Sequence, residues 1–126
     1  MRFPTLAEVI ACNEAVREPD ELSPSADDDD LDLVARALGL VGDSTDPIEA
    51  AADLAFELTR AQGFYEGNKR TAVLIARWFI AMNTEIDPDQ LVPPEDRELA
   101  DLLIRAARGD RVRDEVLNLL RSRAER

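Results

Sequence analysis

The residues best placed to do chemistry lie in one short stretch, residues 62–72, which contains the only lysine of the chain and reads Gln-Gly-Phe-Tyr-Glu-Gly-Asn-Lys-Arg-Thr-Ala. Lys69 and Arg70 follow Gly67 and Asn68, where the pattern predicts the first turn of a long apolar helix. A helix N-terminus carries partial positive charge and unpaired N–H groups, so two adjacent cations are unfavourable there unless an anion lies between them and the helix. A glycine at the opening lets a ligand approach the backbone closely. The stretch therefore predicts a cradle for a phosphate or a carboxylate.

The charge of the chain excludes several partners. Asp and Glu number 27 against 15 Lys and Arg, which gives a formal net charge of −12 over 126 residues. This balance argues against direct binding of nucleic acid, which needs a basic surface, and against an anionic membrane. The chain has no histidine, so a histidine base and a histidine-ligated metal are excluded. We expect no direct nucleic-acid partner and no membrane partner.

Cysteine content and hydropathy indicate the cellular compartment of the protein. The single cysteine, Cys12, rules out an internal disulfide and is expected to be a buried, inert thiol of an amphipathic helix. The N-terminus has no basic flank followed by an apolar run, and no apolar stretch reaches about 20 residues. These features predict a cytoplasmic protein.

The elements that must position the cradle read as helices. Thr5 and Glu8 form a capping box that predicts a helix from about residue 6 to 16. Residues 18–32, with eight acids and no base, predict an acidic solvated loop. A second helix should stop near Gly39 or Gly42, and Asp46-Pro47 predicts the start of a third, which runs to about residue 61 and is ended by Gly63.

The second half of the chain continues the helical pattern. Residues 71–82 are apolar on all sides except at Arg77, which predicts a buried central helix opened by the cations. Residues 85–94 contain three prolines and predict a connection, and two further helices are expected over about 95–107 and 111–123. With 45% hydrophobic and only 5% aromatic residues, the chain is expected to be one domain over residues 1–126. The fold class is all-α, a compact bundle of about six helices around a buried central helix.

In this helical context, residues 62–72 resemble the active-site loop of the Fic/Doc family, and most closely its death-on-curing (Doc) branch. The family pattern, His-x-Phe-x-Asp/Glu-Gly/Ala-Asn-Lys-Arg-Thr-Ala, falls on Gln62, Phe64, Glu66, Gly67, Asn68, Lys69, Arg70, Thr71 and Ala72. The resemblance extends over about residues 45–123 and is weaker over the first 44. It implies an all-helical fold that binds ATP and Mg²⁺ and modifies a hydroxyl of a target protein. Most Fic proteins transfer AMP, whereas Doc-like members are toxins that phosphorylate a threonine of a translation elongation factor and are restrained by a small antitoxin.

The residue types agree with phosphate chemistry. Backbone N–H groups of residues 67–69 would hold phosphate oxygens, with Lys69 as a point charge and Arg70 as a two-pronged donor. Glu66 would supply the single carboxylate that Mg²⁺ needs besides phosphate oxygens. Asn68 is interpreted either as a phosphate ligand or as a turn residue, and Phe64 as a core anchor of the loop.

Two departures from the family pattern affect activity. Gln62 occupies the position of the catalytic histidine, and an amide cannot take the proton of the target hydroxyl, a loss of about 10²–10⁴-fold. A natural pseudoenzyme, a different chemistry and a deliberate replacement are all open explanations. The second arginine of AMP-transferring members is Val73 here, which favours phosphoryl transfer, and Arg77 is expected to pair with an acid or to extend along the surface. The stretch Thr45–Ala50 departs from the self-inhibitory Fic helix at its last position and reads as a helix start.

The leading hypothesis is therefore a Doc-like toxin that is inactive or impaired because of Gln62. The alternatives are a non-catalytic module that binds nucleotide or protein and an AMP transferase. In the simplest alternative, Lys69 and Arg70 only pair with the many acids of the chain.

Overall fold

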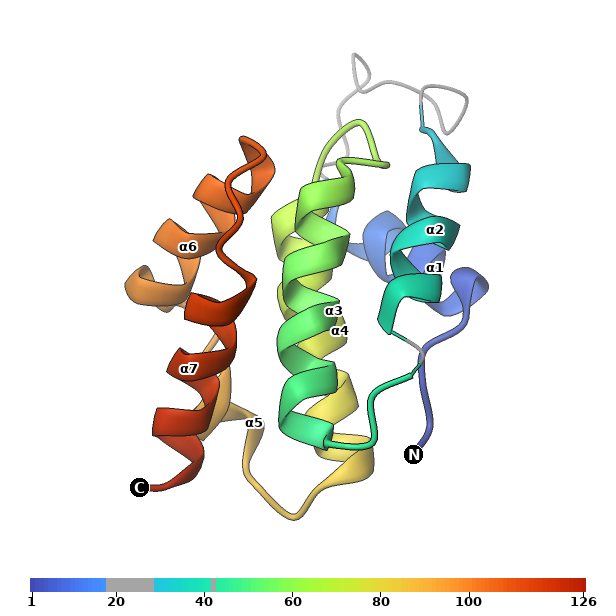
Figure 1. Cartoon of the computed structure of the whole chain (residues 1–126). Coiled ribbons are helices and arrows are strands. Elements are labelled where there is room, and N and C mark those ends of the chain that lie inside the picture. The colour runs from blue at the N-terminus through green and yellow to red at the C-terminus, as the bar shows by residue number, and fades with distance from the viewer. Residues whose placement is uncertain (18–28, 42) are drawn as a thin grey trace.

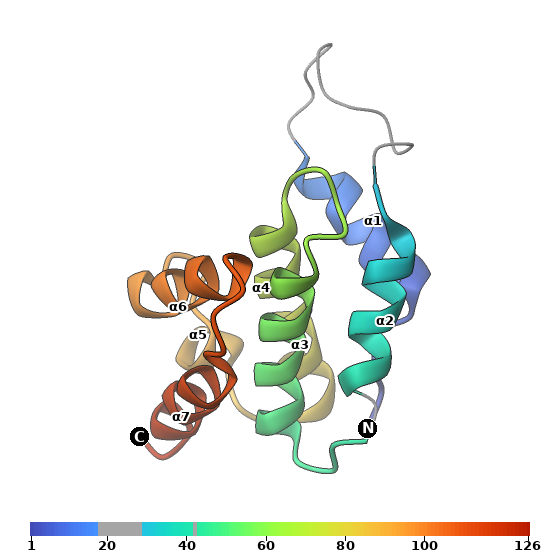
Figure 2. The same ribbon diagram turned by 45° about the horizontal axis from the view of Figure 1, so that its top comes forward.

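The computed structural model describes residues 1–17, 29–41 and 43–126, and all regular structure within them is helical. The helices are α1 (Leu6–Val16), α2 (Leu31–Val41), α3 (Pro47–Ala61), α4 (Asn68–Asn83), α5 (Pro88–Leu91), α6 (Arg97–Ala107) and α7 (Arg113–Ala124). The helices α3 and α4 pack against each other at the centre, with α1 and α2 on one side and α6 and α7 on the other (Figures 1 and 2). The predicted all-α bundle is confirmed.

Local sequence signals explain where the first and third helices begin. The amide of Glu8 donates to the Thr5 hydroxyl at 3.1 Å, and the Thr5 amide donates to the Glu8 carboxylate at 3.1 Å, so the predicted capping box forms. The Asp46 carboxylate accepts from the Ile48 amide at 2.9 Å, with Pro47 at the first helical position. Both predicted starts are confirmed, including the reading of residues 45–50 as a helix start.

The segment of residues 85–94 contains a short helix that was predicted to be only a connection. The Asp87 side chain accepts from the Asp89 amide at 2.9 Å and so caps α5, in which Pro88 takes the first position. This helix accounts for the difference between the expected six helices and those observed in the described ranges. Helices α6 and α7 each begin two residues later than expected.

Two helices, α3 and α4, contribute buried residues to the centre of the bundle. Helix α3 is enclosed by α2, α4, α6 and α7, and nearly all of its residues from Ala50 to Thr59 are buried. Helix α4 buries one face, while Leu74 and Met82 are 41% and 49% exposed on the other. The buried central helix expected over residues 71–82 is thus present, but α3 is the more enclosed of the pair.

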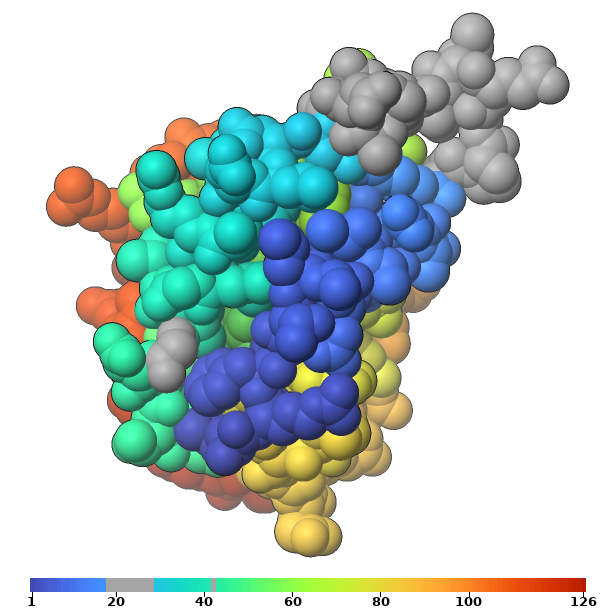
Figure 3. Space-filling view, turned by 90° about the vertical axis from the view of Figure 1, so that its right-hand side faces the viewer, coloured from blue at the N-terminus to red at the C-terminus, as the bar shows by residue number. Residues whose placement is uncertain are grey.

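The N-terminal residues close the far end of α4. The Asn83 side chain accepts from the Arg2 amide at 2.7 Å and donates to its carbonyl at 3.0 Å, and the Phe3 and Phe79 rings lie 5.3 Å apart. Figure 3 shows this segment packed over the end of α4 and beside α1 and α2. The N-terminal segment therefore braces the helix that carries the cations.

Two sequence predictions concern residues at or near the limits of the described ranges. Most of the acidic loop expected over residues 18–32 falls on residues 18–28, which lie outside the described residues, as does Gly42.

No helix in the described ranges combines the length and the apolar character that a membrane span requires.

Gly63 and Gly39 differ in the space around them, which leads to opposite predictions for alanine. A Cβ atom on Gly63 would lie 2.5 Å from the Val34 side chain and 2.9 Å from the Asp30 carbonyl oxygen. A Cβ atom on Gly39 would meet no described atom within 4 Å apart from its chain neighbours and the nearby backbone of α2. We expect Gly63→Ala to lower the free energy of unfolding by about 1–3 kcal/mol through overpacking. Gly39→Ala, inside α2, should raise it by about 0.5–1 kcal/mol. Urea titrations of both variants measure this, and equal effects would contradict the close approach of α2 to the loop.

Candidate active site

The loop between α3 and α4 begins with a glutamine in the left-handed conformation. Gln62 has φ 50° and ψ 38° at the C-terminus of α3, and its side-chain amide donates to the Thr59 carbonyl at 2.6 Å. The prediction that Gly63 ends this helix is therefore corrected: Gln62 makes the reversal, and Gly63 is needed because α2 approaches it closely. The position expected for a catalytic histidine is thus a helix cap.

The middle of the loop is closed by Asn68. Its side-chain oxygen accepts from the Phe64 amide at 3.0 Å, and its side-chain nitrogen donates to the Phe64 carbonyl at 2.7 Å. Both residues are buried, with 8% of Asn68 and 5% of Phe64 exposed, which confirms Phe64 as a core anchor. Of the two interpretations of Asn68, the structure shows the turn residue, and a phosphate contact through its backbone N–H stays a prediction.

In the part of the chain that the structure describes, no side-chain cap bonds the first N–H groups of helix α4. Gly67 is the N-cap residue with φ 77°, it offers no side chain, and the first turn contains no acid. The first turn of a helix has N–H groups without intrahelical partners, and here no side chain of the N-cap residue occupies them. An anion at the tip of α4 could accept from these N–H groups, and the predicted cradle stays a prediction.

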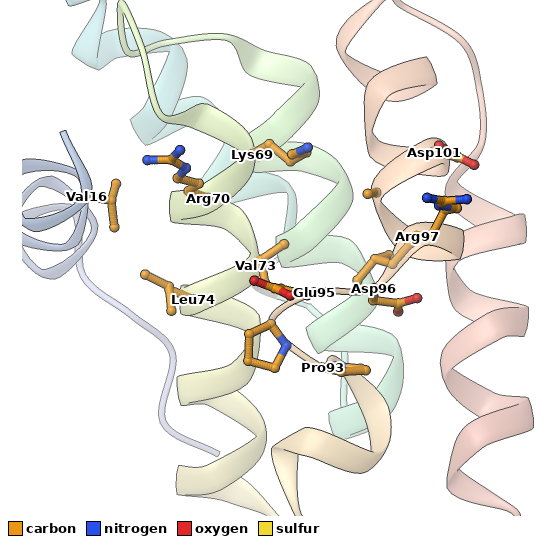
Figure 4. Close-up of a pocket in the computed structure, with 13 residues that line it drawn as sticks. Val16, Lys69, Arg70, Val73, Leu74, Pro93, Glu95, Asp96, Arg97 and Asp101 are labelled. Carbon is orange, nitrogen blue, oxygen red and sulfur yellow. The ribbon is translucent and has the colours of Figure 1, made fainter. Parts of the chain in front are cut away.

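The two cations of the first turn point to opposite sides of α4. Figure 4 shows Lys69 directed toward α6 and Arg70 directed toward α1. Both side chains are exposed, and Lys69 forms no hydrogen bond or ion pair with a described residue. A hollow of about 310 Å³ at the helix tip is lined by both cations and by Glu66 and Gly67. The described residues thus leave Lys69 available to a ligand.

Glu66, which lines this hollow, has one buried carboxylate oxygen. Its Oε1 atom is buried and has no hydrogen-bond partner among the residues that the structure describes. A buried anionic oxygen without a partner is costly unless a cation or a donor reaches it. Within the same ranges, no group of three or more Asp, Glu, Cys or His side chains could hold a metal ion. Glu66 could supply one carboxylate to a Mg²⁺ ion whose other ligands are phosphate oxygens.

A second hollow of about 400 Å³ joins the cap position to this cradle. It is lined by Gln62, Glu66 and Lys69 together with Thr59, Tyr65, Gly67, Asn68, Leu103, Ile104, Ala107 and Arg108. Glu66 and Lys69 line both hollows, so the base position and the helix tip open onto one continuous surface. The structure thus places Gln62, Glu66 and Lys69 around one hollow, while their roles stay a prediction.

A third and larger groove runs along α4 between Val16 of α1 and the beginning of α6. Its volume is about 740 Å³, and Lys69, Arg70, Val73 and Leu74 form its α4 wall. Figure 4 shows Arg97 and Asp101 on α6, and Glu95 on the segment between α4 and α6. The groove continues from the helix tip, so a ligand bound at the cradle has room to extend along α4.

Arg77 lies outside the cradle. Its guanidinium pairs with Asp89 at 2.8 Å and donates to the Val92 carbonyl at 2.7 Å. The expected ion pair with an acid is confirmed. No second arginine from α4 therefore adds to Arg70 at the helix tip.

The sequence did not predict that Asn13 of α1 hydrogen-bonds the loop before α4. Asn13 of α1 is 1% exposed and donates to the Glu66 carbonyl at 2.9 Å. One sequence feature could have identified Asn13: it is a polar residue on the otherwise apolar face of α1 that also contains Val9 and Val16. Cys12, next to it, is half-buried, and burial raises the pKa of its thiol, in agreement with an inert role.

Comparison with known proteins agrees with this geometry. The profile of the Fic/DOC family matches residues 9–80, a range that runs from α1 through the loop and most of α4. A comparison with curated proteins found no match. Because the family match covers more than half of the chain and includes the whole cradle, this chain belongs to the Fic/DOC family.

Proposed function

We propose that this protein binds ATP with Mg²⁺ at the loop and first turn of α4, and that its fold serves phosphoryl transfer to a hydroxyl of a translation factor. Transfer is impaired because Gln62 stands at the position of the general base. One observation carries the proposal: Glu66, whose buried Oε1 atom has no hydrogen-bond partner among the described residues, lines the same hollow as Lys69, at a helix start with no acid of its own. An anion and a cation together would satisfy all of these groups, as magnesium and a triphosphate do.

Each residue of the cradle has one role in this proposal. The backbone N–H groups of the first turn and the Lys69 ammonium hold phosphate oxygens, while Arg70 stabilises the phosphates from the α1 side. Glu66 holds Mg²⁺, which when bound neutralises charge on the phosphate oxygens. Asn68 and Phe64 keep the loop in shape and take no part in transfer.

Phosphoryl transfer is favoured over AMP transfer by the side chains that follow the first turn. Val73 stands where AMP-transferring relatives have a further arginine, and Arg77 is paired with Asp89. Positioning and neutralisation of oxygen charge are the main contributions to phosphoryl transfer. One lysine, one arginine and one carboxylate suffice for a terminal phosphate.

A specific contact favours a second candidate function, a non-catalytic binding module. The Gln62 amide is bound to the Thr59 carbonyl, so this side chain serves the helix end and has no ionisable group to offer. Such a protein would bind nucleotide and a partner without turnover. In either case we propose that the partners are a small antitoxin and a translation elongation factor, in the cytoplasm.

Calorimetry with Mg²⁺ and ATP tests the binding step. We expect wild-type protein to bind, and Lys69→Gln to weaken binding by about 10- to 100-fold because a charged hydrogen bond to phosphate is lost. Arg36→Gln changes the net charge equally but lies on the exposed side of α2, outside the hollows around α4, so its affinity should stay within about twofold. Equal affinities of all three proteins would contradict a phosphate site at Lys69.

A further inference from the structure

Both the oxygen and the nitrogen of the Asn13 side-chain amide form hydrogen bonds within the protein. Its nitrogen donates to the Glu66 carbonyl at 2.9 Å and to the Thr71 hydroxyl at 3.2 Å, and its oxygen accepts from the Arg17 guanidinium at 2.6 Å. A buried amide with all of these bonds made is held in one orientation. Asn13 therefore connects α1 to the loop and to the second turn of α4 in a fixed geometry.

Asp29 holds the same loop from a second direction. Its carboxylate accepts from the Tyr65 amide at 2.9 Å and forms an ion pair with Arg17, and its side chain is only 6% exposed. Asp29 was expected to belong to a solvated acidic loop, and the structure corrects this for its side chain. Arg17, whose guanidinium lies 5.9 Å from the Phe64 ring centroid, joins Asp29 to Asn13.

These contacts lie on both sides of Glu66, whose carboxylate is proposed to hold Mg²⁺ in the cradle. On the N-terminal side of Glu66, the Tyr65 amide donates to Asp29. On the C-terminal side, the Glu66 carbonyl accepts from Asn13. The next residue, Gly67, packs so closely against α1 that a Cβ would lie 3.1 Å from Asn13 Nδ2 and 3.3 Å from Val16. The backbone on both sides of Glu66 is thus fixed by residues distant in sequence.

We propose that Asn13 is a positioning residue of the phosphate cradle, and that Arg17 and Asp29 support it. Asn13 acts through the Glu66 backbone: it sets the direction of the Glu66 carboxylate and the left-handed turn at Gly67 that opens α4. The ligand in this statement, ATP with Mg²⁺, rests on the proposed function. The positioning of the loop does not depend on the ligand.

The variant Asn13→Asp isolates the contact. Aspartate has nearly the same shape and still accepts from Arg17, but it cannot donate to the Glu66 carbonyl. Hydrogen exchange of the amides of residues 65–67 should become about tenfold faster, because a hydrogen bond of about 1.4 kcal/mol is lost. Affinity for Mg²⁺ and ATP should fall by about 10- to 100-fold, as when a partner of a metal-binding carboxylate is removed.

Two control variants separate positioning from general packing. Val9→Ala removes a fully buried side chain of α1 that does not hydrogen-bond the loop, and Thr71→Val removes the other acceptor of Asn13. Both should lower the melting temperature while leaving exchange at residues 65–67 and the affinity for Mg²⁺ and ATP within about twofold of wild type. Accelerated exchange in Asn13→Asp alone supports the proposal.

The outcomes also separate this inference from the proposed function. If Asn13→Asp and Val9→Ala change loop exchange equally, Asn13 is a packing residue and the inference is overturned. If wild-type protein does not bind Mg²⁺ and ATP at all, the proposed function fails, and hydrogen exchange alone decides whether Asn13 positions the loop.

Discussion

Gln62→His is expected to raise the rate of phosphoryl transfer from ATP to a target protein by about 10²–10⁴-fold, because it places a general base at this position. Histidine is among the residue types enriched at positive φ, so the left-handed backbone of residue 62 accommodates it. The Thr59 carbonyl, which now accepts from the Gln62 amide at 2.6 Å, can accept from the imidazole Nδ1–H instead. That bond would fix the tautomer and leave Nε2 unprotonated for the target hydroxyl.

Labelled ATP and bacterial growth together measure this effect. Purified Gln62→His protein is added to bacterial lysate with ATP labelled on the γ- or the α-phosphate, and the same variant is expressed in growing cells. We expect a γ-labelled protein band and slowed growth, neither of which wild type produces at the same level. Label from the α-phosphate would instead indicate AMP transfer.

The matched control adds Glu66→Gln to Gln62→His. It keeps the new base but removes the carboxylate proposed for Mg²⁺, so transfer should return to the level of wild type. A folded Gln62→His protein that binds ATP but transfers neither label would support the non-catalytic module and would count against transfer.

Arg123→Met is expected to lower the free energy of unfolding by about 3–5 kcal/mol, because it leaves a buried carboxylate without its partner. The Arg123 guanidinium forms a two-pronged pair with Asp96 and also donates to the Leu91 carbonyl at 3.0 Å. The two paired side chains are only 7% and 8% exposed. This pair ties α7 to the start of α6 and to the end of α5, so its loss should lower the melting temperature by about 10–20 °C.

Arg121→Met is the matched control on the same helix. Arg121 is 48% exposed and its nearest carboxylate oxygens, on Asp46 and Glu49, lie at 3.4 and 3.5 Å. Exposed ion pairs contribute about 0–1 kcal/mol, so this variant should unfold close to wild type in calorimetry. Equal losses in the two variants would show that Arg123 contributes no more than a surface charge.

The difference between wild type and Arg123→Met should depend on pH. Burial raises the pKa of the Asp96 carboxyl, but hydrogen bonds and the charge of Arg123 outweigh burial, so the pKa lies below its ordinary value of 3.8. A carboxyl with a lowered pKa in the folded state stabilises the protein above the ordinary value and loses this effect as pH falls through the lowered one. The gap in stability should therefore be full at neutral pH and shrink below about pH 4.

Much of the fold followed from local sequence signals. The start of α1 came from the capping box of Thr5 and Glu8, and the start of α3 from Asp46 followed by a proline. Such signals act over three or four residues, so they can be read without knowing the fold. Helix α5 was missed because it has only four residues, too few for a periodic pattern, and lies among prolines.

The candidate site was predictable in part. The position of Lys69 and Glu66 at the start of a helix followed from the loop pattern, but the opposite directions of Lys69 and Arg70 did not. The contacts of Asn13 join residues 53 and 58 positions apart, and no local pattern encodes such a pairing. Likewise, the buried ion pair of Asp29 could not be separated from a run of solvated acids, because burial is decided by the tertiary packing around Arg17.

The solitary lysine of the chain makes the helix tip chemically addressable. Lys69 is the only residue of the printed sequence whose side chain is a primary amine, and it is exposed, so reagents that acylate primary amines modify no other side chain in this sequence. Mass spectrometry of acylated peptides would measure the extent of reaction at Lys69. Occupancy of the cradle by any anionic compound can thus be read as shielding of Lys69 in the unaltered protein.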